Sequence, residues 1–195
     1  MRTLALLALL MLPLSAVAEE RIGLAYSADS GQFMRCLQPQ FGEEWSLYLV
    51  IRDVDVAALS GWEAALIIGG DPYLGPITLY GDAVNHGEGL EFVVTYAAPR
   101  PTTPWMLLAR IDFLTLQYED PYCIELRGVD APAIPGDLPV VHADDGVSRA
   151  VEVDGIGIGR LYQIGICPPV PETPYICSDP TPAESRTWGA LKALY

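Results

Sequence analysis

Hydrophobic and polar residues alternate with a period of two in many segments of the chain, and Gly, Pro, Asn and Asp separate these segments. Such alternation is typical of β-strands that bury one face in a core. The longer predicted strands are Arg21–Ser27, Trp45–Val54, Gly61–Ile68, Leu90–Ala97 and Trp105–Leu116. Shorter strands are predicted over Ile77–Tyr80, Tyr122–Arg127, Leu138–His142, Ala150–Val153 and Gly159–Ile166.

The segments between these strands lack the helical patterns of about 10–15 residues that an α/β fold would require. One helical turn is expected over Val54–Leu59. We therefore predict an all-β fold, with a single β-sandwich of the jelly-roll or immunoglobulin-like kind over residues 19–166.

The alternation also predicts which side chains face the core. In the strand from Trp45 these are Trp45, Leu47, Leu49 and Ile51. In the strand from Trp105 they are Leu107, Ala109, Ile111 and Phe113. Arg110 and Asp112 lie on the opposite face of that strand, where they form either a solvated face or an ion pair.

The first 18 residues have the pattern of a secretory signal peptide. Arg2 is followed by an apolar run from Leu4 to Leu14 and by small residues up to Ala18, directly before Glu19. The apolar run is shorter than the roughly 20 residues of a transmembrane helix. We expect cleavage after residue 18, a secreted or periplasmic location, and no membrane span in the mature chain.

The charge balance is strongly acidic. The chain has 25 acidic and 11 basic residues, with a net charge of −14, and Lys192 is the only lysine. Nucleic acids and anionic lipids require clustered Lys and Arg, so neither is expected as a partner. Charged residues make up only 18% of the chain and apolar ones 51%, which favours a packed domain over disorder.

All four cysteines lie beyond residue 18, and an even number in an exported chain suggests disulfides. Three pairings are possible. We expect Cys167–Cys177, which closes a Pro-rich loop, and Cys36–Cys123, which ties an early loop to a later strand. The absence of a C-x-x-C motif and the presence of only two histidines disfavour zinc.

The character of the sequence changes after residue 166. Residues 167–182 contain six prolines and are predicted to be an extended segment held by a disulfide. Residues 183–195 can form a short helix with Trp188, Leu191 and Tyr195 on one side. Since so short a helix is marginal alone in water, it would dock on this domain or on a partner, or stay disordered.

Few residues suggest catalysis or metal binding. His86 is followed by a glycine and is interpreted as a loop residue, whereas His142 ends a strand before Asp144 and Asp145, which could bind Ca²⁺. No G-x-S-x-G motif is present, so a serine hydrolase is not indicated. Several carboxylates could form a hydrolytic pair. These are Asp53, Asp55, Glu63, Glu88, Glu91, Asp112 and Glu125.

Aromatic residues near strand ends are candidates for ligand contact, because such rings stack on sugars or anchor protein interfaces. We predict Trp105, Tyr118 and Tyr122 as the binding residues. The alternative is that such residues pack in the core or cover loops.

The order of strands resembles that of the cohesin-like and carbohydrate-binding-module β-sandwiches of exported bacterial proteins. The residues that carry the resemblance are 47–51, 59–66, 90–94 and 107–113. The resemblance implies a jelly-roll-like sandwich with a non-catalytic binding role.

These observations together predict a secreted or periplasmic, non-enzymatic binding or structural module. Its expected partner is a protein or a glycan at the cell surface. The alternative hypothesis is a small secreted hydrolase that uses paired carboxylates, which would require two such groups close together in a cleft.

Overall fold

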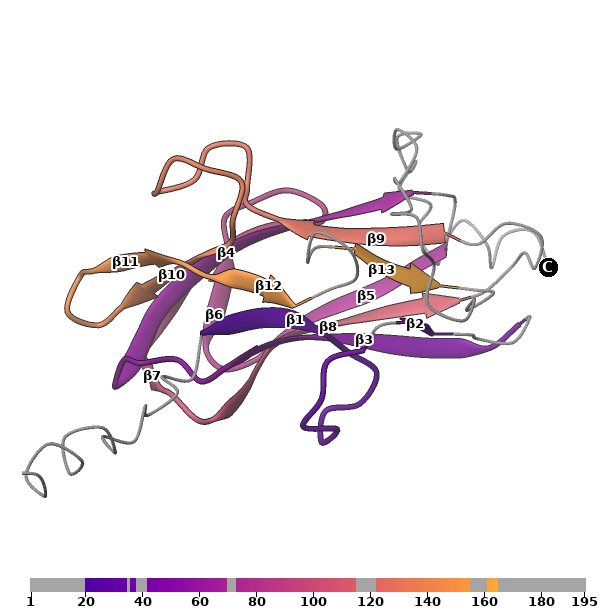
Figure 1. Cartoon of the computed structure of the whole chain (residues 1–195), viewed down its shortest axis with the longest axis horizontal. Helices are drawn as coiled ribbons and strands as arrows, with labels where there is room; N and C mark the ends of the chain where they lie inside the picture. The colour runs from indigo at the N-terminus through magenta and orange to yellow at the C-terminus, as the bar shows by residue number, and fades with distance from the viewer. Residues whose placement is uncertain are drawn as a thin grey trace, which may run out of the picture.

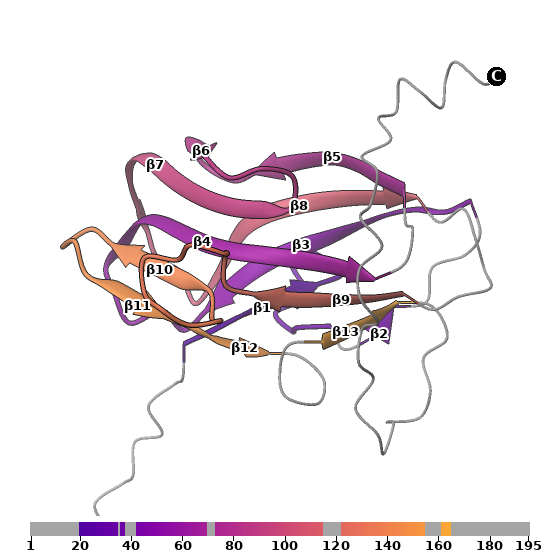
Figure 2. The same cartoon turned by 90° about the horizontal axis from the view of Figure 1, so that it is seen from above.

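The computed structural model describes residues 20–34, 36–37, 42–69, 73–114, 122–154 and 161–164. Within these ranges the chain forms thirteen β-strands and no helix. The strands form two sheets, which are the layers of a β-sandwich (Figure 1 and Figure 2). The predicted all-β sandwich is therefore confirmed for this part of the chain. The predicted signal peptide 1–18, the Pro-rich segment 167–182 and the tail 183–195 lie outside it.

The smaller sheet has five strands in the order β12-β1-β3-β8-β5. Strands β1 and β12 are parallel, and the other neighbours are antiparallel. The bounds, in sheet order, are Glu152–Asp154, Arg21–Ala25, Glu44–Arg52, Trp105–Leu114 and Tyr73–Leu79.

The larger sheet has eight strands and is built around the long strand β4, Ala58–Gly69. Its main path is β11-β10-β4-β9-β13-β2, while β7 pairs with β4 and with β6. The other bounds in this path are Ser148–Ala150, Val140–Ala143, Tyr122–Arg127, Leu161–Ile164 and Cys36–Leu37. Strand β7 is Glu91–Pro101 and β6 is Ala83–Asn85. The hairpin of β10 and β11 lies at one end of the molecule, and β9, β13 and β2 lie toward the other (Figure 1).

Side chains from both sheets meet in one hydrophobic core. In β3 the predicted inward residues Trp45, Leu47, Leu49 and Ile51 are all buried. Two aromatic pairs in this core join neighbouring strands of the same sheet. Trp45 stacks on Phe113 with ring centroids 4.3 Å apart, and Trp62 meets Phe92 at 5.4 Å. Such pairs stabilise a core beyond the area that they bury.

The prediction for β8 is correct in its second half and wrong at Leu107. Ala109, Ile111 and Phe113 are buried, but Leu108 is fully buried while Leu107 is only partly so. The register explains this difference, because Leu49 pairs with Ala109 and Val50 pairs with Leu107, which leaves Leu108 as an extra residue. A β-bulge of this kind reverses the alternation on one side of it.

The helical turn predicted for Val54–Leu59 is also wrong. The carbonyl oxygens of Val56 and Ala57 accept hydrogen bonds from Thr102, and β4 begins at Ala58. The carbonyls that a helical turn would use internally therefore accept hydrogen bonds from Thr102, directly after β7, instead.

In the described residues no helix is long and apolar enough to cross a membrane.

Candidate functional site

Five neighbouring strands of the larger sheet bring one line of residues to its outer face. The pairings β6–β7, β7–β4, β4–β10 and β10–β11 align Val84, Thr95, Gly61, His142 and Ser148. Directly paired residues share a face of the sheet, and Thr95 and Val84 are exposed, so the line faces outward. We call these five residues the outer row.

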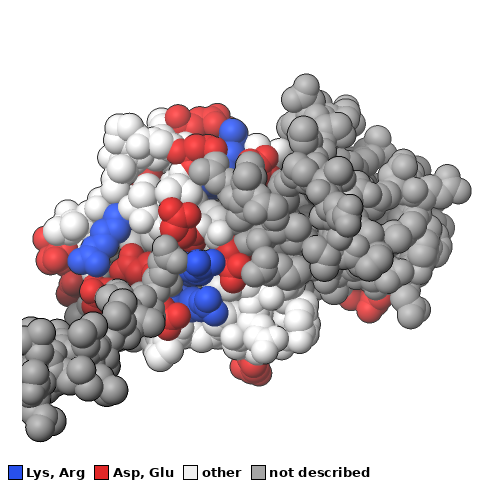
Figure 3. All heavy atoms as spheres, in the orientation of Figure 1, with Lys and Arg blue, Asp and Glu red and all other residues white. Residues whose placement is uncertain are grey.

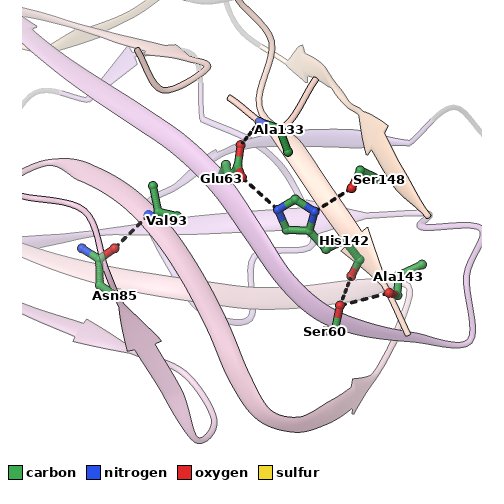
Figure 4. Close-up of polar contacts among 8 residues, drawn as sticks. All are labelled: Ser60, Glu63, Asn85, Val93, Ala133, His142, Ala143 and Ser148. Atoms are coloured by element: carbon green, nitrogen blue, oxygen red, sulfur yellow. Dashed lines mark hydrogen bonds and ion pairs between the residues drawn. The ribbon is translucent and has the colours of Figure 1, made fainter. Parts of the chain in front are cut away.

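A buried carboxylate supports one half of the outer row. Glu63 on β4 is only 7% exposed. Its Oε1 lies 3.1 Å from His142 Nε2, and its Oε2 accepts a hydrogen bond from the backbone N–H of Ala133 at 2.9 Å (Figure 4). His142 Nδ1 lies 2.9 Å from Ser148 Oγ. Because the carboxylate can only accept, a neutral imidazole donates from Nε2 and accepts the Ser148 hydroxyl at Nδ1.

Local irregularities of the strands place His142 beside Glu63. The register of β4 shifts near Ser60, and that of β10 shifts between His142 and Ala143. The hydroxyl of Ser60 joins the two irregular points, since it donates toward the carbonyl oxygens of His142 and Ala143 at 3.2 and 3.0 Å (Figure 4). The Ser60 side chain of β4 therefore contacts β10 at the point where its register shifts.

Gly61 is required by the close approach of β7. A Cβ atom at this position would lie 2.3 Å from the carbonyl oxygen of Val94 and 3.4 Å from Cδ2 of His142. A larger residue would push β7 and the imidazole away from β4. Glycine at this point therefore keeps the outer row continuous across three strands.

The other half of the outer row is held by the turn between β6 and β7. Asn85 Oδ1 accepts hydrogen bonds from the N–H groups of Gly87 and Val93, at 3.1 and 2.8 Å. His86 lies in this turn, as predicted, and its Nε2 is 2.9 Å from Thr95 Oγ1. Both histidines of the chain thus lie beside hydroxyl groups of the outer row.

The arrangement suits hydrogen bonding with a partner. A hydroxyl, an imidazole and a carboxylate in series also occur in hydrolases, where the hydroxyl attacks a bound substrate. Here Ser148 and His142 are directly paired residues of the β10–β11 hairpin, and Val147 in the turn of that hairpin is exposed. A cavity lined by Glu44 and Asp112 lies on the smaller sheet, and neither Ser148 nor His142 lines it.

The alternative hypothesis of paired carboxylates leads to the smaller sheet. There Arg110 Nε is 2.7 Å from Asp112 Oδ1, which confirms the ion pair that was one of the two predicted arrangements. Glu44 and Asp112 line one cavity on this sheet. One oxygen of Asp112 is already occupied, because it accepts hydrogen bonds from both Arg110 and Ser46.

Of the three predicted binding aromatics, only the side chain of Trp105 is described. Trp105 packs on Phe33 with centroids 5.2 Å apart, and its Nε1 donates to the carbonyl oxygen of Ala28 at 3.0 Å. It therefore covers the loop after β1. Tyr118 lies outside the described residues, and for Tyr122 only its backbone position in β9 is described.

The predicted calcium ligands lie in the turn between β10 and β11. Asp145 Oδ1 accepts a hydrogen bond from Val147 N at 2.9 Å, and Gly146 has a φ of 83°. Asp145 thus stabilises the turn itself. Among the described residues no group of three or more His, Cys, Asp or Glu side chains could hold a metal ion. Calcium binding by Asp144 and Asp145 stays a prediction.

Cys36 and Cys123 are described only in their backbone positions. Both pair with Gln163, from opposite sides of β13. Two strand spacings are about 9.5 Å, whereas a disulfide joins Cα atoms about 4.4–6.8 Å apart. This register does not support the Cys36–Cys123 bridge, which stays a prediction. Cys167 and Cys177 lie outside the described residues, as do Trp188, Leu191 and Tyr195.

The distribution of charge on the viewed face is mixed. Arginine side chains lie singly or in small groups among more numerous carboxylates (Figure 3). Exposed pairs such as Arg127 and Asp130, 3.1 Å apart, contribute little to stability. The viewed face therefore presents both signs of charge to a partner.

Comparisons with known proteins give similarity in structure only. No family model and no curated protein matches the sequence. A cohesin module from a Clostridium perfringens family 33 glycoside hydrolase is similar with 11% identity and a TM-score of 0.49, over 75% of this chain and 97% of its own. A non-cellulosomal cohesin from Archaeoglobus fulgidus has 13% identity and a TM-score of 0.46, over 75% and 91%.

A third similar structure is the sixth cohesin of scaffoldin B from Acetivibrio cellulolyticus, solved in complex with a dockerin. It has 7% identity and a TM-score of 0.48, over 76% of this chain and 97% of its own. These three solved structures are cohesin modules, the kind of sandwich that the sequence pattern of this chain resembles.

Proposed function

We propose that this chain is a non-enzymatic, secreted or periplasmic module that binds a protein partner on the outer face of its larger sheet. One observation carries the proposal. Val84 is 54% exposed at one end of the outer row, and Val147 is 47% exposed in the turn beside Ser148 at the other end. Two exposed apolar side chains therefore border a line of hydrogen-bonding groups.

The size and chemistry of this face suit a protein better than a small molecule. Five strands at a spacing of about 4.8 Å make a surface about 19 Å across. Thr95, His142 and Ser148 can exchange hydrogen bonds, and the two valines can pack against apolar groups of a partner. Protein interfaces combine these features over flat areas, whereas small ligands are bound in concave sites.

The side chains that support the face are held by hydrogen bonds, which lowers the entropic cost of docking. Glu63 fixes His142, and Asn85 fixes the β6–β7 turn. Groups that are already held in place lose little further freedom when they bind. The predicted signal peptide and cysteines favour action outside the cytoplasm.

The experiment compares partner capture by variants of the mature chain, residues 19–195. Val84→Arg and Thr95→Arg place a long cation on the proposed face. The matched control is Tyr26→Arg, because Tyr26 is 57% exposed and directly follows β1 of the other sheet. The chain is attached through Lys192, the only lysine. Dockerin domains from the producing organism are the first partners tested, because one similar cohesin was solved with a dockerin.

We expect one purified protein to bind the wild type and the Tyr26→Arg variant with equal affinity. Its affinity for Val84→Arg and for Thr95→Arg should be lower by at least about tenfold. Equal affinity for all three variants would place the interface elsewhere and refute the proposal.

A further inference from the structure

The outer face of the smaller sheet carries a second group of polar and aromatic residues. The register places Tyr48 opposite Arg110, and Arg110 opposite Thr78, in one row across β3, β8 and β5. Ser46 and Asp112 pair directly in the next row. Because paired residues share a face and Arg110 is exposed, these side chains are on the solvent side of the sheet.

The centre of this group is a compact hydrogen-bonded set. Asp112 Oδ1 accepts from Ser46 Oγ at 2.6 Å and from Arg110 Nε at 2.7 Å, and Arg110 Nε also lies 3.1 Å from Ser46 Oγ. All of these contacts use Oδ1 and Nε. The second carboxylate oxygen and the terminal nitrogens of the guanidinium make no hydrogen bond to the described residues, and can therefore bind a ligand.

A cavity of about 240 Å³ opens beside this set. Its other wall comes from Gly75 and Pro76 of β5. The register of β5 against β8 shifts between Leu74 and Ile77, so these residues bulge away from the regular ladder. Proline has no N–H to donate, which suits this interruption. The remaining lining residues are Glu44, Trp45, Ser46, Arg110, Asp112 and Phe113.

Two tyrosines lie beside the hydrogen-bonded set. Burial raises the pKa of the Tyr80 phenol, Tyr48 and Asp112 raise it further, and Arg110 opposes them. Tyr80 lies two residues beyond Thr78, which pairs with Arg110, and its backbone N–H donates to the carbonyl oxygen of Leu108 at 3.0 Å. Both tyrosines are half-buried, so part of each side chain remains accessible.

We propose that this surface is a binding cleft for a neutral oligosaccharide. Sugar hydroxyls both donate and accept hydrogen bonds, and they match the unused oxygen of Asp112 and the terminal nitrogens of Arg110. The apolar faces of sugar rings match the rings of Tyr48 and Tyr80. Glu44 adds a further acceptor at the cavity.

The charge of the surroundings selects a neutral ligand over an acidic one. Arg110 is the cation of the cleft, whereas Asp112 and Glu44 are both acidic, and the whole chain has a net charge of −14. A polyanion would meet repulsion that a neutral sugar does not. This inference does not depend on the proposed protein interface, because that interface lies on the other sheet.

The test is isothermal titration calorimetry of the mature chain with cellohexaose, xylohexaose and maltohexaose, and with oligogalacturonate as the acidic probe. We expect at least one neutral hexasaccharide to bind at millimolar concentration. Asp112→Asn and Tyr80→Ala should each weaken this binding by about tenfold or more. Glu152→Ala, at an exposed position of the edge strand β12 and outside both proposed sites, is the matched control and should leave this binding unchanged.

Circular dichroism of each variant shows whether it is folded, and Tyr48→Ala supplies a second aromatic variant if Tyr80→Ala is unfolded. The inference is overturned if no neutral hexasaccharide binds at millimolar concentration, if only oligogalacturonate binds, or if the folded variants bind as tightly as the wild type. None of these results bears on partner capture at the outer row, so the two proposals fail independently.

Discussion

Replacement of Glu63 by alanine tests whether the buried carboxylate organises the outer row. The substitution removes the acceptor for two donors, the backbone N–H of Ala133 and Nε2 of His142. A hydrogen bond to a charged group contributes about 1.5–3 kcal/mol, and a buried donor without a partner is destabilising by a similar amount. Since Ala133 is exposed and the imidazole is partly exposed, both donors can reach water, and we expect Glu63→Ala to lower the free energy of unfolding by about 1.5–3 kcal/mol.

The assay is urea unfolding followed by tryptophan fluorescence, with an unchanged dependence on urea as the sign that the folded and unfolded states are comparable. Glu63→Gln retains an acceptor for the N–H of Ala133, so this variant should lose less unfolding free energy, about 1 kcal/mol. Glu152→Ala is the control, because Glu152 is exposed on β12 and its loss should stay within about 0.5 kcal/mol.

A double-mutant cycle with His142→Ala then isolates the pair. The side chains of Glu63 and His142 lie 3.1 Å apart. If they interact, the loss of unfolding free energy in the double variant should differ from the sum of the two single-variant losses by at least about 0.5 kcal/mol. Additive losses, or a Glu63→Ala variant as stable as Glu152→Ala, would refute the reasoning.

Three further predictions concern other parts of the chain. Gly61→Ala should destabilise the domain by about 1–3 kcal/mol in the same assay, since its Cβ would overlap the Val94 carbonyl; unchanged stability would contradict that packing. Subtracting the 295 nm titration of Tyr80→Phe from that of the wild type should give a midpoint above 10.0, and the stability that Tyr80 contributes should be lost as the pH rises through that midpoint. Non-reducing peptide mapping should find Cys167 joined to Cys177, and a Cys36–Cys123 bridge would show that β13 does not separate them.

The sequence pattern predicts strand bounds and inward faces correctly where the strand pairing is regular. The bounds of β9 agree with the prediction, and the inward faces of β3 and β4 follow from simple alternation. The pattern failed at Leu108, because a bulge depends on the partner strand as well as on the strand's own residues. The short strands β2 and β6 were missed because two or three residues carry too little periodicity.

The candidate site was less accessible from the sequence than the fold. Alternation places Glu63 on the outer face of β4, because its neighbours Trp62 and Ala64 face the core. The sequence also predicts His142 near the end of a strand, and it lies in β10 one residue before the end. Their contact joins positions 79 residues apart, and it depends on β10 pairing with β4. Strand order across a sheet is set by the tertiary fold, so alternation within each strand could not bring these two residues together.

The parallel pairing of β1 with β12 has a consequence for how the protein folds. Positions 21–23 of the first strand pair with positions 152–154. During synthesis β1 can pair with β3 early, but one of its edges stays open until almost the whole described chain is available. Contacts so far apart in sequence form slowly, and an open strand edge invites pairing with other chains. A chain that ends before residue 152 would keep that edge exposed, and we expect it to aggregate.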